Sequence, residues 1–135
     1  MTEFQYAESF DPPGPALRVR LGQTASGAHI DVLALLDTGA DQNVVPAAIA
    51  ARLRLAYIGD AKVLVYREGD KVEAEKPVYA GHIVIGDGLA SGIMRWLEHD
   101  HEASQEYILI GRPILNQLVL YLHGPHLTGR IEAAS

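Results

Sequence analysis

An apolar run that ends in a carboxylate is the part of this sequence best suited to chemistry. Leu35 and Leu36 lead directly into Asp37, Thr38 and Gly39. An ionised carboxylate is costly to bury unless it is hydrogen-bonded, and a glycine two residues later lets the backbone approach and donate its N–H groups. The pattern suits a carboxylate that is held at a strand end for acid–base work. The plain alternative is an Asp that only forms a turn.

A second motif lies near the C-terminus. Three aliphatic residues, 108–110, precede Gly111 and Arg112. The run 113–118 is expected to be a short helix, because its leading proline is well tolerated at the start of a helix.

In this order, the two motifs resemble those of the retropepsin-like aspartic proteases, a family of single-domain, retroviral-type enzymes. The resemblance covers most of the chain, from about Ala16 to His123. It implies a mainly β, single-domain fold: a closed or folded β-barrel with a flap hairpin and one or two short helices. The activity that it implies is that of an aspartic endopeptidase, which hydrolyses peptide bonds in a peptide or protein substrate.

The resemblance also implies a catalytic group made of Asp37, Thr38 and Gly39. Asp37 would supply the reacting carboxylate, Thr38 would brace the two active-site loops of a dimer, and Gly39 would offer its carbonyl to the substrate backbone. The chain has a single Asp-Thr-Gly, whereas the chemistry needs two carboxylates. An active enzyme is therefore expected to be a homodimer with one Asp37 from each subunit.

Two carboxylates held this close share one proton. The ionised partner would act as a general base toward a water molecule, and the protonated partner would hydrogen-bond the scissile carbonyl. This chemistry needs no metal, no cofactor and no covalent intermediate.

Substrate binding is implied for Asp41, Ala40 and Gly69, and structural support for Gly111 and Arg112. An ion pair is expected between Arg112 and Asp41 within one subunit, because an unpaired charge at the edge of a buried site is costly and Arg can bind a carboxylate through two N–H donors. The plain alternatives are a surface Arg at a helix start and an acidic residue that complements a helix dipole.

The remaining pattern predicts many short strands and about two short helices. Residues 1–15 end in Asp-Pro-Pro-Gly-Pro and are expected to be an arm, because proline breaks regular structure, while 16–135 would form the protease-like domain. Alanines over 47–53 predict a helix, with Pro46 as its first residue. Strands are expected over 16–21, 28–36, 62–66, 71–79, 107–110, 118–122 and 126–131, and 81–85 either continues the strand before it or starts another. A surface loop is expected over 98–106, and either strand or helix over 93–97.

The strands on either side of Glu68, Gly69 and Asp70 are expected to form a hairpin in the position of the family's flap. A flap excludes water and holds an extended peptide by main-chain hydrogen bonds. The viral flap tip is Gly-rich and apolar, whereas 67–71 here is charged and has one glycine. This departure somewhat favours a second hypothesis: a catalytically weak, retropepsin-like module for peptide binding or dimerisation. A third is an unrelated small β-barrel with a chance match.

Bulk properties exclude several other classes. The 135 residues suggest one domain, and the absence of Cys excludes disulfides, a thiolate nucleophile and a Cys-ligated zinc site. A net charge of −6 disfavours a nucleic-acid partner. The acidic N-terminus does not read as a signal peptide, no apolar run nears the roughly 20 residues that span a bilayer, and a cytoplasmic location is expected.

Histidines invite a metal site, but none is expected. His99 and His101 flank Asp100, and His123 and His126 flank a Gly-Pro turn. Neither pair has an identifiable set of partner ligands, so solvated loop histidines are the better interpretation.

Overall fold

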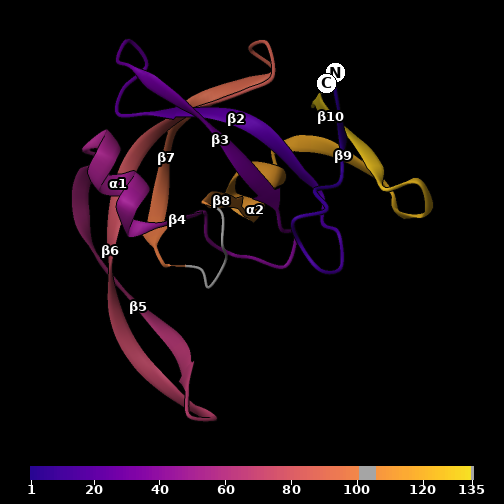
Figure 1. Ribbon diagram of the computed structural model, residues 1–135. Helices are drawn as coiled ribbons and strands as arrows, with labels where there is room; N and C mark the ends of the chain where they lie inside the picture. Colours follow the sequence, from indigo (N-terminus) through magenta and orange to yellow (C-terminus); the bar gives the residue numbers. More distant parts are fainter. Residues whose placement is uncertain (101–105, 135) are drawn as a thin grey trace.

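The computed structural model describes residues 1–100 and 106–134 and shows a mainly β fold with two short α-helices in that part of the chain (Figure 1). The fold class predicted from the sequence is confirmed. The elements are β1 (Thr2–Gln5), β2 (Ala16–Gly22), β3 (His29–Leu36), β4 (Val44–Val45), α1 (Ala47–Leu53), β5 (Ala56–Arg67), β6 (Asp70–Ile85), β7 (Ala90–Glu98), β8 (Tyr107–Ile110), α2 (Arg112–Leu115), β9 (Leu118–His123), the 3-10 turn η1 (Gly124–His126) and β10 (Thr128–Ala133).

Seven strands form one sheet in the order β2-β3-β8-β4-β7-β6-β5, and an additional pairing of β2 with β6 closes six of them into a ring. Strands β3 and β8 are parallel neighbours in this ring, with Leu35 beside Leu109 and Leu36 beside Ile110. This pairing brings the ends of the two sequence motifs to the same edge of the barrel, because parallel strands end side by side.

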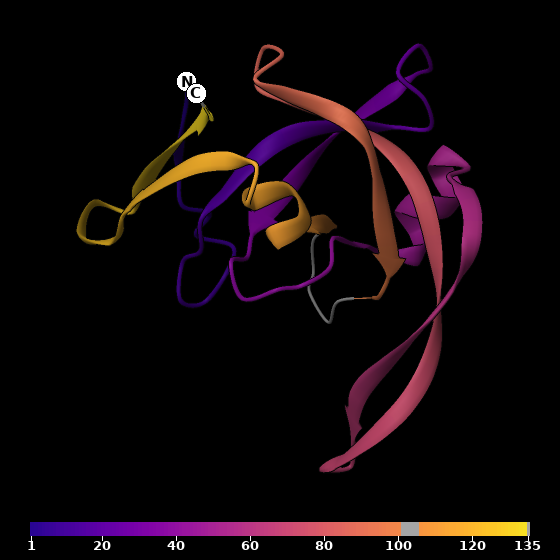
Figure 2. The ribbon, with the colours of Figure 1, turned by 180° about the vertical axis from the view of Figure 1, so that it is seen from behind.

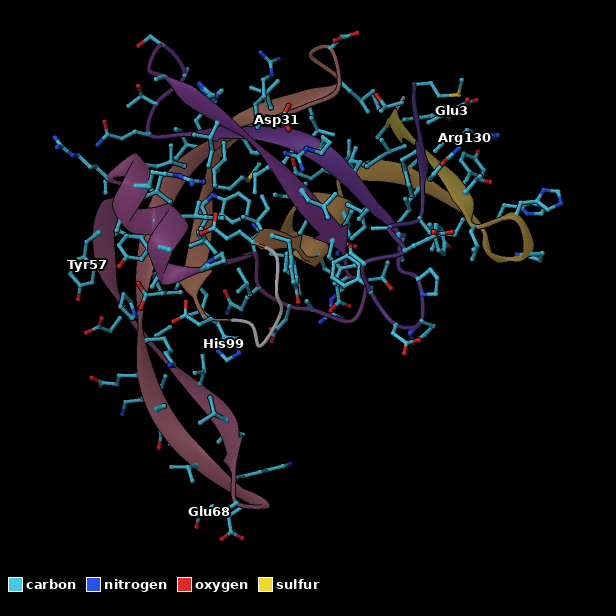
Figure 3. All side chains as sticks on the ribbon, in the orientation of Figure 1. Glu3, Asp31, Tyr57, Glu68, His99 and Arg130 are labelled. Atoms are coloured by element: carbon cyan, nitrogen blue, oxygen red, sulfur yellow. The ribbon has the colours of Figure 1, made fainter. Side chains whose placement is uncertain are left out.

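Strand β5 lies outside the ring and pairs only with β6 among the described strands. The resulting hairpin projects from the barrel, and Figure 3 places Glu68 at its far tip. The tip residues Glu68 and Gly69 have positive φ values of 51° and 83°, as a two-residue type I′ turn requires. The predicted hairpin is confirmed. Its strands are longer than predicted, since β5 begins at Ala56. The range 81–85 continues β6, which is one of the two alternatives that the sequence left open.

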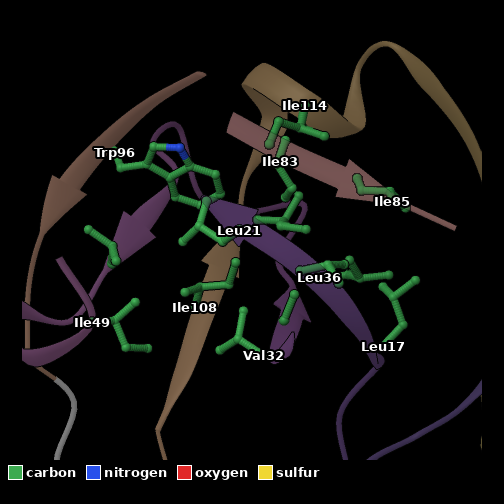
Figure 4. Close-up of a cluster of buried hydrophobic side chains, with 14 of the residues drawn as sticks. Leu17, Leu21, Val32, Leu36, Ile49, Ile83, Ile85, Trp96, Ile108 and Ile114 are labelled. Atoms are coloured by element: carbon green, nitrogen blue, oxygen red, sulfur yellow. The ribbon is translucent and has the colours of Figure 1, made fainter. Parts of the chain in front are cut away.

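The core fills the ring with aliphatic side chains that alternate along the strands. In β2 the sequence Leu17–Leu21 alternates between buried and exposed positions, as a half-buried strand should. Trp96 of β7 is fully buried and its indole N–H donates to the carbonyl of Gly81 at 3.1 Å. The range 93–97, ambiguous in the sequence, is therefore a strand whose inner face carries the largest core side chain (Figure 4).

Helix α1 covers Ala47–Leu53 as predicted, with Ile49 and Ala50 buried on its inner face. Pro46 was predicted as its first residue, but it is the extended N-cap with φ −65° and ψ 149°. The helix ends at Arg54, whose left-handed φ of 52° turns the chain into β5. Helix α2 is shorter than predicted, with bounds of Arg112–Leu115.

A second, three-stranded sheet has the order β1-β10-β9. Strand β1 lies within the N-terminal stretch 1–15 and is antiparallel to β10, with Thr2 opposite Ile131 and Gln5 opposite Thr128. Phe4 and Ile131 join its inner face to the main core. The view from behind in Figure 2 shows this sheet on the side of the barrel away from the β5–β6 hairpin.

Candidate active site

Asp37 lies directly after β3, where its backbone N–H donates to the carbonyl of Ile110 at 2.9 Å and so continues the pairing of β3 with β8. The backbone N–H of Gly39 donates to Oδ1 of Asp37 at 2.9 Å, and the N–H of Ala40 donates to the Asp37 carbonyl at 3.2 Å. The carboxylate is half-buried and held by its own turn. This is the hydrogen-bonded strand-end carboxylate that the sequence predicted.

The second motif packs against this turn. The backbone N–H of Arg112 donates to the Ala40 carbonyl at 2.9 Å. A Cβ on Gly111 would lie 2.5 Å from the carbonyl oxygen of Gln42 and 2.8 Å from that of Ala40. Only glycine lets the two segments approach this closely, so the structure gives a physical reason for the glycine of the Ile-Gly-Arg motif.

The expected ion pair between Arg112 and Asp41 is not formed in the single chain. No side-chain nitrogen of Arg112 lies within 4.0 Å of a carboxylate oxygen of Asp41. Instead, Nη1 of Arg112 donates to the backbone carbonyl of Thr38 at 3.2 Å. Both charged side chains are exposed, so the desolvation cost on which the prediction depended does not arise here.

Asn43 is a residue of this region that the sequence reasoning missed. It is 1% exposed, its Oδ1 accepts the backbone N–H of Gly111 at 3.0 Å, and its Nδ2 donates to the carbonyl of Arg95 at 3.3 Å. The available signal was an amide side chain directly before Val44 and Val45, in a segment that enters the barrel. A buried polar side chain at such a point needs partners, and here the partners belong to both neighbouring segments.

Most of the predicted site residues therefore gather in one turn cluster, made of Asp37, Thr38, Gly39, Ala40, Gly111 and Arg112. Thr38 and Gly39 are exposed, as is Asp41, so this surface is open in the single chain. Gly69 lies apart from the cluster, at the tip of the projecting hairpin. The individual roles of these residues stay predictions.

No group of three or more His, Asp or Glu side chains is placed to hold a metal ion within residues 1–100 and 106–134. The rings of His123 and His126 stack at 4.2 Å, and His29 and His82 share a hydrogen bond of 2.8 Å. His101 and most of the predicted loop 98–106 lie outside the described residues. In the part of the chain that the structure describes, no helix has the length and apolarity needed to cross a membrane.

No protein-family model and no curated protein matches the chain. One solved structure that is similar to it is an EIAV protease complexed with the inhibitor HBY-793. The two chains are 25% identical, with a TM-score of 0.49, and the match covers 76% of this chain and 86% of the other. At this TM-score the likeness does not by itself support a function.

Proposed function

We propose that this protein is an aspartic endopeptidase that acts as a homodimer. The observation that carries the proposal is the hydrogen bond from the Gly39 N–H to Oδ1 of Asp37, in a turn at an open edge of the barrel. One oxygen of the carboxylate is fixed by the backbone, while the surface around it stays exposed. A second copy related by a two-fold axis at this surface would supply the other carboxylate.

In the proposed reaction, the ionised Asp37 takes a proton from a water molecule while the water oxygen bonds to the scissile carbonyl carbon. The protonated Asp37 of the other copy gives its proton to the carbonyl oxygen, which yields a tetrahedral diol. Return of a proton to the amide nitrogen then breaks the C–N bond and releases an amine and a carboxylic acid. Thr38, exposed beside Asp37, would bond across the dimer, and Gly39, Ala40 and Asp41 would meet the substrate backbone.

The β5–β6 hairpin is the proposed flap. Its cross-strand pairs Val63–Ala74 and Val65–Val72 give it an apolar face, which suits contact with a substrate or with the partner's hairpin. Gly69 at the tip would offer its backbone to the peptide, as in other strand-addition modes of recognition. A cytoplasmic location stays a prediction from the sequence.

The charged tip favours one alternative, a peptide-binding or dimerisation module with weak or no catalysis. Glu68 and Asp70 are both exposed at the tip, and closing them over a substrate would require their desolvation, which is costly for charged groups. This alternative keeps the same surface and the same dimer but lacks turnover.

Cleavage of a mixed peptide library, from mildly acidic to neutral pH and with or without pepstatin, tests the proposal. Wild type should cleave peptides and pepstatin should inhibit it. Asp37→Asn should abolish cleavage, with a loss of several orders of magnitude, because an amide cannot act as the base. Equal cleavage by wild type and this variant would remove Asp37 from the mechanism.

Asp31→Asn is the matched control, since it makes the same isosteric change on β3, the strand that leads into Asp37. Asp31 binds Arg18 at 2.6 Å on the exposed surface (Figure 3), where an ion pair contributes little to stability. This variant should keep full activity. Peptide binding without cleavage by the wild type would favour the binding-module alternative.

A further inference from the structure

A hollow of about 740 Å³ opens on the small sheet β1-β10-β9, and its lining belongs to these strands and to η1. Phe4 and Ile131 of this sheet are buried against the core, so the side chains that alternate with them point to the outer face. The volume is within the range of about 300–1,000 Å³ that is typical of small-ligand sites. Figure 2 shows this sheet away from the β5–β6 hairpin.

The register of the strands arranges the outer side chains of the hollow in rows. In one row, Glu3 lies opposite Arg130, and Arg130 lies opposite Tyr121. In the next row, Thr128 lies opposite His123. All of these residues line the hollow, and positions two apart on a strand are separated by about 7 Å. One end of the hollow therefore carries two charged groups, and the other end carries an imidazole.

The guanidinium of Arg130 is oriented by two neighbours. Its central carbon lies 3.9 Å from the centroid of the Tyr121 ring, and its Nε lies 3.3 Å from Oε1 of Glu132. Stacking on an aromatic ring and an ion pair together restrict the rotation of a guanidinium. The ion pair uses the Nε atom, whereas the edge that carries both Nη groups has the geometry to bind a carboxylate through two N–H donors.

Glu3 supplies the opposite charge. It is exposed and lies directly opposite Arg130 in the register, and Figure 3 shows both residues on this sheet. Opposite charges at such positions commonly pair across strands, yet among the described residues the ion pair of Arg130 is with Glu132 and not with Glu3. The hollow thus presents a carboxylate and a guanidinium side by side, and each can receive its own group of a ligand.

The histidines at the other end add a planar surface. The rings of His123 and His126 stack with their centroids 4.2 Å apart and an interplanar angle of 29°. Both residues are exposed and line the same hollow. An aromatic ring of a ligand can stack on such a pair. The hollow therefore combines two opposite charges with a surface for an aromatic ring.

We propose that this hollow binds a free amino acid with an aromatic side chain. The α-carboxylate binds the Nη edge of Arg130, the α-ammonium binds Glu3, and the side-chain ring stacks on the histidine pair. Such a ligand carries both charges on one carbon atom, which matches two charged residues on neighbouring strands. The site does not depend on the proposed peptidase function, because Asp37 takes no part in it.

Titration of the full chain with L-phenylalanine, followed by calorimetry and by NMR, tests the site. Phenylalaninamide lacks the carboxylate, and phenylpropanoate lacks the ammonium group. Each should bind about fivefold to tenfold more weakly than phenylalanine, because each loses one charge-assisted hydrogen bond in a half-open site. L-Alanine, which lacks the ring, should also bind more weakly. Amide signals of β1, β9 and β10 should shift, and those of the Asp37 turn should not.

Two substitutions identify which residue binds which charge. Arg130→Gln should bind phenylalanine and phenylalaninamide equally, because the partner of the carboxylate is gone. Glu3→Gln should bind phenylalanine and phenylpropanoate equally, because the partner of the ammonium group is gone. Arg20→Gln and Glu75→Gln are the matched controls, since each removes an exposed charge from the seven-stranded sheet. Both controls should keep the wild-type preferences.

Absence of phenylalanine binding at millimolar concentration would overturn the proposal. Equal binding of the acid and its amide by the wild type would overturn it too, because the ring alone would then adsorb to the surface. Asp37→Asn should bind phenylalanine as the wild type does. Loss of binding in that variant would place the ligand at the Asp37 turn and would also contradict the proposal. Since the peptidase test depends on Asp37 and this one on Glu3 and Arg130, either can fail without the other.

Discussion

The side chain of Asn43 accepts the backbone N–H of Gly111 at 3.0 Å, across 68 positions of sequence. The accepting atom is Oδ1, and Nδ2 of the same side chain donates to the carbonyl of Arg95 at 3.3 Å. A single buried amide thus joins the segment after Asp37 to β7 and to the second motif. The orientation of the Asp37 turn therefore depends on the Asn43 amide as well as on β3, the strand that leads into Asp37.

Asn43→Ala should therefore destabilise the fold. The substitution leaves the Gly111 N–H and the Arg95 carbonyl without their side-chain partner in a buried site, at a cost of about 2 kcal/mol. Urea denaturation of wild type and variant measures the change in the free energy of unfolding. Asn116→Ala is the matched control, because Asn116 is exposed, and its effect should be within about 0.5 kcal/mol. Equal effects for the two variants would contradict the bracing role of Asn43.

Gly111→Ala should be destabilising for a steric reason. The backbone of Gly111, with φ −102° and ψ −168°, is open to alanine, but the new Cβ would lie 2.5 Å from the Gln42 carbonyl oxygen. Backbone atoms must then shift, at a cost of about 1–3 kcal/mol, and the Asp37 turn should shift with them.

Gly124→Ala provides the comparison for that experiment, since nothing lies within 4 Å of a Cβ added at Gly124. Thermal unfolding should show a lowered Tm for Gly111→Ala and a nearly unchanged one for Gly124→Ala. The same midpoint for both would show that the two segments are not closely packed in solution.

The assembly of the proposed enzyme can be tested by dilution. If each active site needs Asp37 from two copies, specific activity should fall once the protein concentration drops below the dimer dissociation constant. Sedimentation velocity at matched concentrations should show monomer where activity is lost. Undiminished specific activity of a monomer would rule out a shared site.

The raised pKa of Tyr79 predicts that the stability of the fold depends on pH in the alkaline range. Burial and then its hydrogen bond to Glu98 raise the pKa of this phenol above the ordinary 10.0, and the bond measures 2.9 Å. The folded state thus holds the proton more tightly than the unfolded state does. The resulting stability is fully present below pH 10.0 and is lost as the pH rises through the folded-state pKa.

Tyr79→Phe should accordingly be less stable than wild type near neutral pH, by about 1 kcal/mol for the lost hydrogen bond, and should lose less stability above pH 10.0. Free energies of unfolding over this range test both statements. Tyr121→Phe, which alters an exposed tyrosine, is the control and should follow the wild-type curve. If the free energy of unfolding of Tyr79→Phe fell as steeply with pH as that of the wild type, Tyr79 would not be the source of the alkaline loss of stability.

Local pattern was enough to predict the strands that carry the site. The apolar run before Asp37 and the aliphatic residues before Gly111 are β3 and β8, because burial on the inner face of a barrel requires such residues. Their parallel pairing was not predictable from either segment alone. It depends on the closure of the ring, a long-range feature that short-range periodicity does not contain.

The errors at the site have the same origin. Arg112 and Asp41 were expected to pair because both were assumed to lie in a desolvated region, yet both are exposed in the single chain. Asn43 was overlooked because its partners, Gly111 and Arg95, are distant in sequence. In both cases the missing information was the tertiary environment of a polar side chain, which sets its cost and its partners.

The antiparallel pairing of β1 with β10 determines how the molecule would respond to mechanical load. Thr2 is opposite Ile131 at one end of this pair, and Gln5 is opposite Thr128 at the other. The two chain ends lie together at the first of these positions (Figure 1). Force applied to both ends would therefore load the hydrogen bonds between β1 and β10 one after another, in an unzipping geometry. In a shear geometry these bonds would bear the load together. The small sheet would peel open from Thr2 at low force, before the strands that carry Asp37 bear tension.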